Sequence, residues 1–407
     1  MSPKGRPEGE LHRSARREGS PVSARRQLLG GLTAGAFLHR HWQREALLVR
    51  EAVHGFAGLH SRTALIALAC RDDVESRLIV RERGRYSLAH GPFRRADFRS
   101  LPARDWTLLV QGVNLHDDAT DSLMRAFSFV PYARLDDVMV SYAAPGGGVG
   151  PHFDAYDVFL LQGFGRRRWR YGHQHDLTLV PGMPVKILRR FEPTDDAVLG
   201  PGDMLYLPPE LAHDGIAVDA CTTYSIGFRA AAYEELAQHF LDAMRDGIAL
   251  PGRYADPGLH ATHTPARIDP AMTRTIAAAL AGIRWKPQDV RRFVGAFLSE
   301  PKATVQFSRP ARRSSAAFAK AAADRGVTLD RRTQLLYDEN AFYVNGEPLR
   351  LPVSGAATLR ALANTRALSA AEFRAAPRAL RALLREWYAH GYLAVATRSH
   401  PRAGRAA

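Results

Sequence analysis

Three side chains in this sequence have the types and the spacing needed to hold a transition metal. His152 and Asp154 lie two residues apart in the stretch from Ser141 to Gly172, and His213 follows 61 residues after His152. Two histidines and one carboxylate form the facial triad that binds Fe(II) and leaves coordination positions open for other ligands. The sequence therefore predicts an iron site.

The chain around the first two of these residues is expected to be extended. The segment Pro145–Gly148 contains three glycines, which allow a sharp turn into an extended stretch. Side chains two apart on a strand face the same side, so His152 and Asp154 would point together. A second His-x-Asp, at His116 and Asp118, leads into apolar-spaced residues and is interpreted as a loop that caps a helix.

His213 follows a second recognisable segment. Pro201–Asp203 predicts a turn, Met204–Leu207 a short apolar strand, and two prolines end that strand. A histidine placed in this way on its own would be a surface or turn residue. Paired with the His-x-Asp, it is expected to be the third ligand. In a double-stranded β-helix such ligands come from strands that are distant in sequence and adjacent in space.

Three consecutive arginines, Arg166 to Arg168, follow a glycine turn. On a strand, Arg167 points opposite to its two neighbours. An arginine inside a barrel needs an anionic partner, and its planar fork can bind a carboxylate through two hydrogen bonds. Arg167 is therefore a candidate for the distal carboxylate of 2-oxoglutarate, whose keto-acid end would chelate the iron. A basic surface strand is the alternative, and it is the interpretation for Arg166 and Arg168.

The stretch SYAAPGGGVGPHFDAYDVFLLQGFGRRRWRYG, together with GPGDMLYLPPELAHDG, YSIGFRA and the earlier FLHRHWQREALLVREA, resembles the bacterial ribosomal oxygenases of the JmjC/cupin superfamily. The resemblance is most specific from Leu28 to Ala230. It implies an Fe(II)- and 2-oxoglutarate-dependent dioxygenase that uses O₂ to hydroxylate an arginine of large-subunit ribosomal protein sixteen at its β carbon.

The resemblance also assigns roles to residues. It makes His152, Asp154 and His213 the iron ligands, Arg167 the group that grips the distal carboxylate, and Ser141 a nearby position in that pocket. Animal relatives are similar but have a lysine where Arg167 stands, so the chain groups with the bacterial branch. From their place just after the ligands, Tyr156 and Asp157 are expected to line the substrate mouth.

The predicted fold class is α+β, a double-stranded β-helix (cupin/JmjC jelly roll) followed by a helical dimerisation region and a winged-helix-like domain. The domains are expected at 1–26 (a disordered basic tail), 27–230 (the catalytic domain), 231–303 (the helical region) and 304–407 (the winged-helix-like domain with a short basic tail). The helices in 231–303 have apolar faces and little core of their own. The resemblance implies that they form a homodimer; packing on the barrel is the alternative.

The net charge of +15 suits an anionic partner such as RNA or a ribosome. Only five of the 56 basic residues are lysines, so part of this charge can reflect a compositional preference for arginine. A winged helix often binds DNA, but the arginines at 378, 381 and 385 alternate with leucines and favour a solvated helix face.

No secretory signal or run of about 18 apolar residues is present, which predicts a cytoplasmic protein without a membrane span.

Two other functions remain open from the residues alone. The same oxygenase chemistry could act on another protein target, by hydroxylation of histidine or asparagine or by demethylation. The chain could also be a non-catalytic cupin joined to a winged helix, acting as a regulator. Intact iron ligands and a strand arginine argue against the regulator, because pure binding requires neither.

Overall fold

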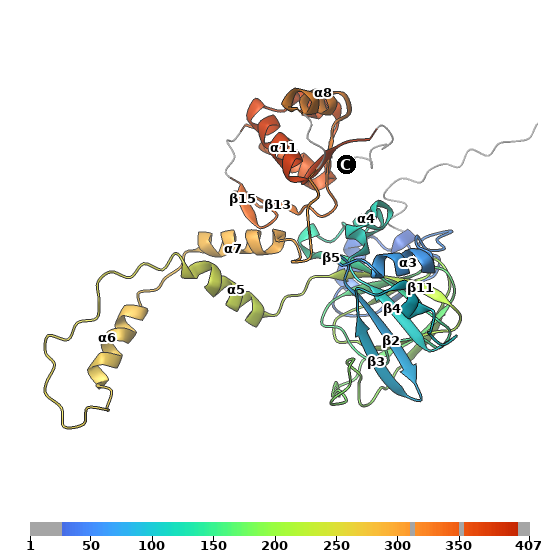
Figure 1. Cartoon of the computed structure of the whole chain (residues 1–407), viewed down its shortest axis with the longest axis horizontal. Coiled ribbons are helices and arrows are strands. Elements are labelled where there is room, and N and C mark those ends of the chain that lie inside the picture. The colour runs from blue at the N-terminus through green and yellow to red at the C-terminus, as the bar shows by residue number, and fades with distance from the viewer. Residues whose placement is uncertain (1–26, 310–313, 350–353, 398–407) are drawn as a thin grey trace, which may run out of the picture.

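The computed structural model describes residues 27–309, 314–349 and 354–397. The tail expected at 1–26 lies outside the described residues. The described chain forms a β-rich body, a helical arm that projects from it, and a carboxy-terminal domain above the body in Figure 1. None of the helices in these ranges is long and apolar enough to cross a membrane.

Two facing sheets form the β-rich body. The larger sheet has eight strands in the order β1 (Leu47–Val49), β9 (Met204–Leu207), β6 (Val158–Gln162), β11 (Cys221–Phe228), β5 (Leu135–Ala143), β4 (Trp106–Val110), β2 (Ser76–Glu82) and β3 (Arg85–His90). The smaller sheet has the order β10 (Ala212–Ala217), β7 (Arg167–Gly172) and β8 (Asp195–Leu199). All neighbouring strands run antiparallel, which is the arrangement expected of a jelly roll.

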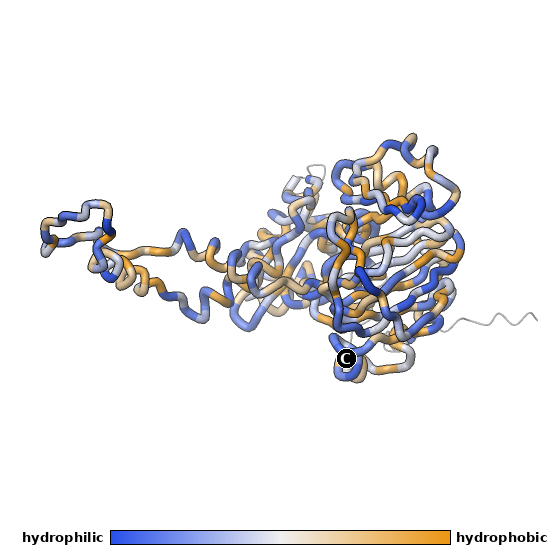
Figure 2. Tube along the Cα trace, turned by 90° about the horizontal axis from the view of Figure 1, so that it is seen from below, coloured by the Kyte–Doolittle hydropathy of each residue, from blue (hydrophilic) through white to orange (hydrophobic). Residues whose placement is uncertain are grey.

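The alternation of side chains along the central strands separates a hydrophobic core from the interior that faces the smaller sheet. On β5, Val138, Val140 and Tyr142 belong to the main core, so Ser141 points the other way. The core is dominated by large buried side chains such as Phe159. Apolar segments run through the strands of the body in Figure 2, while the arm alternates between apolar and polar stretches.

Short helices cover the core side of the larger sheet: α2 (Ala34–Arg40), α3 (Arg62–Ala69) and α4 (Asp118–Arg125). The Asp117 side chain caps α4 by accepting a hydrogen bond from the backbone N–H of Thr120 at 2.7 Å. The second His-x-Asp of the sequence is thus part of a helix cap, as its context predicted.

The arm contains α5 (Tyr233–Arg245), α6 (Pro270–Leu280) and α7 (Pro287–Ser299). Helix α6 lies far from the body (Figure 1). Helix α7 contacts α5 and also packs on the three-stranded sheet of β13 (Leu335–Tyr337), β14 (Phe342–Val344) and β15 (Glu347–Leu349). It therefore belongs to the packing of the carboxy-terminal domain as well as to the arm.

The carboxy-terminal domain begins with α8 (Ser315–Arg325) and β12 (Val327–Leu329), continues through the β13–β15 sheet, and ends with α9 (Ala356–Thr365), β16 (Ala367–Leu368), α10 (Ala370–Ala375), α11 (Arg378–His390) and β17 (Leu393–Val395). Three helices follow β15. Ser369 and Glu372 form a capping box that starts α10. Pro377 then separates α10 from α11, because the residue before a proline avoids helical angles.

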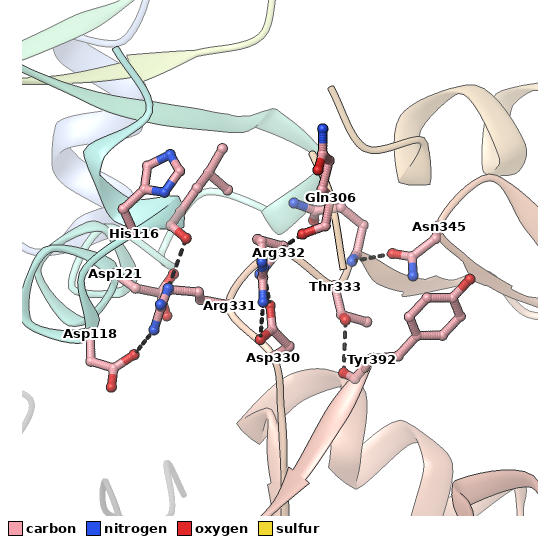
Figure 3. Close-up of polar contacts among 12 residues, drawn as sticks. His116, Asp118, Asp121, Gln306, Asp330, Arg331, Arg332, Thr333, Asn345 and Tyr392 are labelled. Atoms are coloured by element: carbon pink, nitrogen blue, oxygen red, sulfur yellow. Dashed lines mark hydrogen bonds and ion pairs between the residues drawn. The ribbon is translucent and has the colours of Figure 1, made fainter. Parts of the chain in front are cut away.

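Charged side chains join the carboxy-terminal domain, and the segment between α7 and α8 that leads into it, to the body. The Arg331 guanidinium donates to the Leu115 carbonyl at 2.8 Å. It also pairs with Asp118, as Figure 3 shows. Lys302 Nζ lies 3.0 Å from Asp136 and 3.2 Å from the buried carboxylate of Asp137. These contacts hold the two parts of the molecule together.

Candidate active site

The three predicted metal ligands come together between the two sheets. His213 lies on β10, and His152 and Asp154 lie in the connection between β5 and β6. One ligand atom from each of the three residues lies within 4.8 Å of the other two. This is the only such group of three or more potential metal ligands in the described ranges.

The local structure around His152 differs from the strand that the sequence predicted. His152 forms an isolated β-bridge with His213, and Asp154 lies outside any strand. The preceding Pro151 has no N–H to donate, so a regular ladder does not extend through this segment. A hydrogen bond from the Glu210 N–H to the Asp154 carbonyl, at 2.7 Å, fixes the connection against the turn before β10 instead.

Both histidines are oriented by a carbonyl two residues upstream. His152 Nδ1 lies 2.8 Å from the Gly150 carbonyl, and His213 Nδ1 lies 2.8 Å from the Leu211 carbonyl. With Nδ1–H donating in each ring, Nε2 keeps its lone pair for a metal. His213 Nε2 lies 3.7 Å from Asp154 Oδ2, so the free nitrogen and the carboxylate face each other.

The electrostatics also fit a metal. Burial, and secondarily the neighbouring His152, lowers the pKa of His213 to about 4. The imidazole is therefore neutral near pH 7, which is the form that binds a metal ion. Two imidazoles and one carboxylate are a donor set suited to Fe(II).

Arg167 opens β7 and is buried, with 4% of its surface exposed. Its Nε and Nη2 atoms are buried without a hydrogen-bond partner, and the guanidinium lies 5.7 Å from the centre of the Trp169 ring. A buried cation without an anion is costly, so this site fits a carboxylate that is supplied from outside the chain. The neighbours Arg166 and Arg168 are exposed and pair with Asp219 and Asp196, as expected of surface residues.

Ser141 is buried on β5 directly opposite Thr223 of β11, and its hydroxyl lies 3.5 Å from the Thr223 carbonyl. Two further polar groups were not identified from the sequence, Thr107 Oγ1 and Trp169 Nε1, and both are buried without a partner. The Trp169 ring centre lies 6.0 Å from that of His213. Trp169 could have been identified from the sequence, because it lies two residues after Arg167 and so faces the same side of the strand. The sequence around Thr107 gives no indication that its side chain is buried.

Of the two residues expected at the substrate mouth, only Tyr156 is exposed, at 41% of its surface. Asp157 is fully buried, and the expectation that it lines the mouth is wrong. Its carboxylate accepts hydrogen bonds from Tyr206 at 2.6 Å, Gln43 at 3.0 Å and Arg134 at 3.4 Å. Asp157 is therefore a structural anchor just before β6.

Comparison with known proteins agrees with this geometry. A JmjC domain model matches residues 122–236, and a ROXA-like winged-helix model matches residues 282–394. Ribosomal protein uL16 3-hydroxylase of Escherichia coli is 34% identical over 340 residues, which cover 83% of this chain and 90% of that protein. Ribosomal oxygenase 1 of Rattus norvegicus is 31% identical over 221 residues, which cover 49% of this chain and 36% of that protein.

The fold is also that of solved structures. The Escherichia coli ribosomal oxygenase in complex with cobalt and 2-oxoglutarate superposes with a TM-score of 0.74 at 33% identity, covering 89% of this chain and 98% of that one. Its complex with cobalt and succinic acid gives a TM-score of 0.75.

A jelly roll that carries a His-Asp-His cluster and a buried arginine without a partner defines a JmjC-type, iron- and 2-oxoglutarate-dependent oxygenase. This excludes the non-catalytic regulator. The chain belongs to the ribosomal oxygenase family, as the resemblance predicted.

Proposed function

We propose that this enzyme hydroxylates the β carbon of an arginine in large-subunit ribosomal protein uL16. The observation that carries the proposal is the His-Asp-His cluster together with the unpaired Arg167 guanidinium on β7, the strand paired with the one that carries His213, in a chain aligned over 83% of its length with a uL16 3-hydroxylase. His152, Asp154 and His213 would hold the iron. Bound iron supplies the activation of O₂ that is coupled to conversion of 2-oxoglutarate into succinate and CO₂.

The residues of the chain then have distinct tasks. Arg167 binds the distal carboxylate of 2-oxoglutarate and so sets the orientation of its keto-acid end, and Ser141 contributes to the same pocket. The carbonyls of Gly150 and Leu211 keep the two imidazoles in the tautomer that presents Nε2. The two packed sheets exclude water from the reacting groups. Tyr156, exposed next to the cluster, is placed to contact the substrate.

The direct test uses the purified enzyme with Fe(II), 2-oxoglutarate, O₂ and a peptide set covering uL16 of the same organism. We expect one peptide to gain the mass of a single oxygen, assigned by tandem mass spectrometry to an arginine β carbon. The matched peptide with that arginine replaced by alanine should gain none. Oxygen on a histidine or asparagine, or loss of a methyl group, would identify one of the alternative reactions instead.

We further propose that the arm forms a homodimer. Of the 18 exposed large apolar side chains in the described ranges, 12 lie between Tyr233 and Val294. A monomer rarely exposes so many apolar groups on one segment, whereas a second copy would bury them. We expect light scattering to give twice the monomer mass for the parent protein. The double variant Leu241→Glu, Ile276→Glu should give the monomer mass. Val198→Glu, at an exposed apolar position on β8, is the control and should leave the mass unchanged.

A further inference from the structure

Helices α10 and α11 form a helix-turn-helix within the carboxy-terminal domain. A two-residue turn, Ala376 and Pro377, joins them, and α11 leads into β17 of the sheet β16–β12–β17. Helix α11 thus occupies the place of the second helix, which in helix-turn-helix proteins contacts nucleic acid. The contacts that join this domain to the body come from other segments, at Lys302, Arg331 and Asn364, whose carbonyl accepts a hydrogen bond from the Tyr132 hydroxyl.

Four arginines on these two helices form an exposed row, which we call the arginine stripe: Arg374, Arg378, Arg381 and Arg385. The spacings of three and four residues place Arg378, Arg381 and Arg385 along one side of α11, and Arg374 lies on α10 across the turn. The opposite side of α11 packs into the core through Leu380, Leu384 and Trp387. The stripe is continuous across the turn, because Arg381 Nη1 donates to the Arg374 carbonyl at 3.3 Å.

The arginine stripe carries charge that is not neutralised within the described ranges. No carboxylate in those ranges forms an ion pair with any of its four members. Arg71 and Arg168, by contrast, are exposed arginines that are paired, with Asp73 and Asp196. Arg374 and Arg381 donate only to neutral backbone carbonyls, those of Ala323 and Arg374, so the stripe keeps its positive charge and can bind phosphate.

The residues between the arginines favour contact with the phosphate backbone of a nucleic acid over recognition of its bases. The exposed positions 375, 379 and 382 are all alanines, which let a polyanion approach the helix closely and have no groups that hydrogen-bond to bases. The three arginines of α11 span about 10 Å at a rise of 1.5 Å per residue. That length faces several phosphates of a duplex.

We propose that the arginine stripe binds the phosphate backbone of structured RNA, independently of base sequence. The choice of RNA over DNA rests on the proposed function, since a ribosomal protein substrate lies among RNA. The surface is separate from the iron site and would hold the enzyme near nascent ribosomal particles.

The test is fluorescence anisotropy of the full-length protein with a fluorescein-labelled 20-base-pair RNA duplex over a range of salt. The variant carries Arg378→Gln, Arg381→Gln and Arg385→Gln. The control carries the same charge change at exposed, paired arginines: Arg40→Gln, Arg94→Gln and Arg245→Gln. We expect the stripe variant to bind at least about 10-fold more weakly, with a salt slope lower by about one for each phosphate that an arginine no longer neutralises. The control should bind as the parent does.

Three results would overturn the proposal: equal weakening in both variants, no RNA binding by the parent protein, or a DNA duplex that competes as well as RNA. Circular dichroism and the melting temperature verify that both variants fold. Hydroxylation of the isolated uL16 peptide separates this proposal from the proposed function. The stripe variant should hydroxylate the peptide at the parent rate, whereas failure of the proposed function appears as an inactive parent enzyme.

Discussion

His152 and His213 exchange two backbone hydrogen bonds. The N–H of His152 lies 2.9 Å from the carbonyl oxygen of His213, and the N–H of His213 lies 2.8 Å from that of His152. This pair is an isolated bridge between a connecting segment and strand β10. It fixes one ligand relative to the other even though the segment that carries His152 has no strand of its own.

The metal site yields the first prediction. His213→Ala removes one of three ligands, and we expect affinity for Fe(II) or Co(II), measured by isothermal titration calorimetry, to fall by more than the about 10–100-fold typical of losing an outer-shell partner. His116→Ala is the matched control, because His116 belongs to the other His-x-Asp and lies outside the cluster. Unchanged metal binding in His213→Ala would contradict the ligand assignment.

Arg167 is expected to govern the co-substrate. Arg167→Ala loses charge-assisted hydrogen bonds worth about 1.5–3 kcal/mol each, which raises the KM for 2-oxoglutarate by at least about 100-fold for a bidentate contact while iron still binds. Succinate production against 2-oxoglutarate concentration measures this. Arg168→Ala, on the exposed side of the same strand, should leave the KM as it is. An unchanged KM for 2-oxoglutarate in Arg167→Ala would contradict the assignment of Arg167 as the residue that binds its distal carboxylate.

The glycine segment before His152 should tolerate no side chain. A Cβ at Gly147 would lie 2.2 Å from the carbonyl oxygen of Trp106, so we expect Gly147→Ala to lower the free energy of unfolding by about 1–3 kcal/mol. Gly35→Ala is the control, since Gly35 is exposed within α2 and a Cβ there meets nothing within 4 Å. That change should stabilise the protein by up to about 1 kcal/mol. Thermal melts that rank the two variants the other way would refute the packing argument.

Asp157 is expected to act on stability and not on substrate binding. Asp157→Ala leaves the buried hydroxyl of Tyr206 and amide of Gln43 without their acceptor, at a cost of about 2–4 kcal/mol. The KM for the peptide substrate should not change. Asp196→Ala breaks only an exposed pair and should shift stability by less than about 1 kcal/mol. If the variant had a raised KM for the peptide and an unaltered melting temperature, Asp157 would contact the substrate and the structural role would be contradicted.

The sequence predicted the parts of the site that obey local rules. The two-residue period that turns Arg167 inward and the strand before His213 follow from backbone geometry, whereas the strand expected at His152 and Asp154 is replaced by an isolated bridge. The helix cap at Asp117 was identified in the same way. Where these predictions hold, residue type and local spacing were sufficient to predict the structure.

Features that depend on tertiary contacts were not predicted. The placement of Asp157 depends on Tyr206 and Gln43, which are distant in sequence. The burial of Thr107 is set by neighbouring strands, and the packing of α7 on the β13–β15 sheet is set by a domain that follows it in the chain. None of these contacts produces a pattern in the neighbouring sequence from which it could be predicted.

The most direct test of the central claim is intact-mass analysis of large-subunit ribosomal proteins from cells that have the gene, lack it, or carry Arg167→Ala in its place. We predict that uL16 alone is lighter by one oxygen in the deletion strain and in the Arg167→Ala strain, with the oxygen mapped to an arginine. Identical masses of uL16 in all three strains would contradict the account.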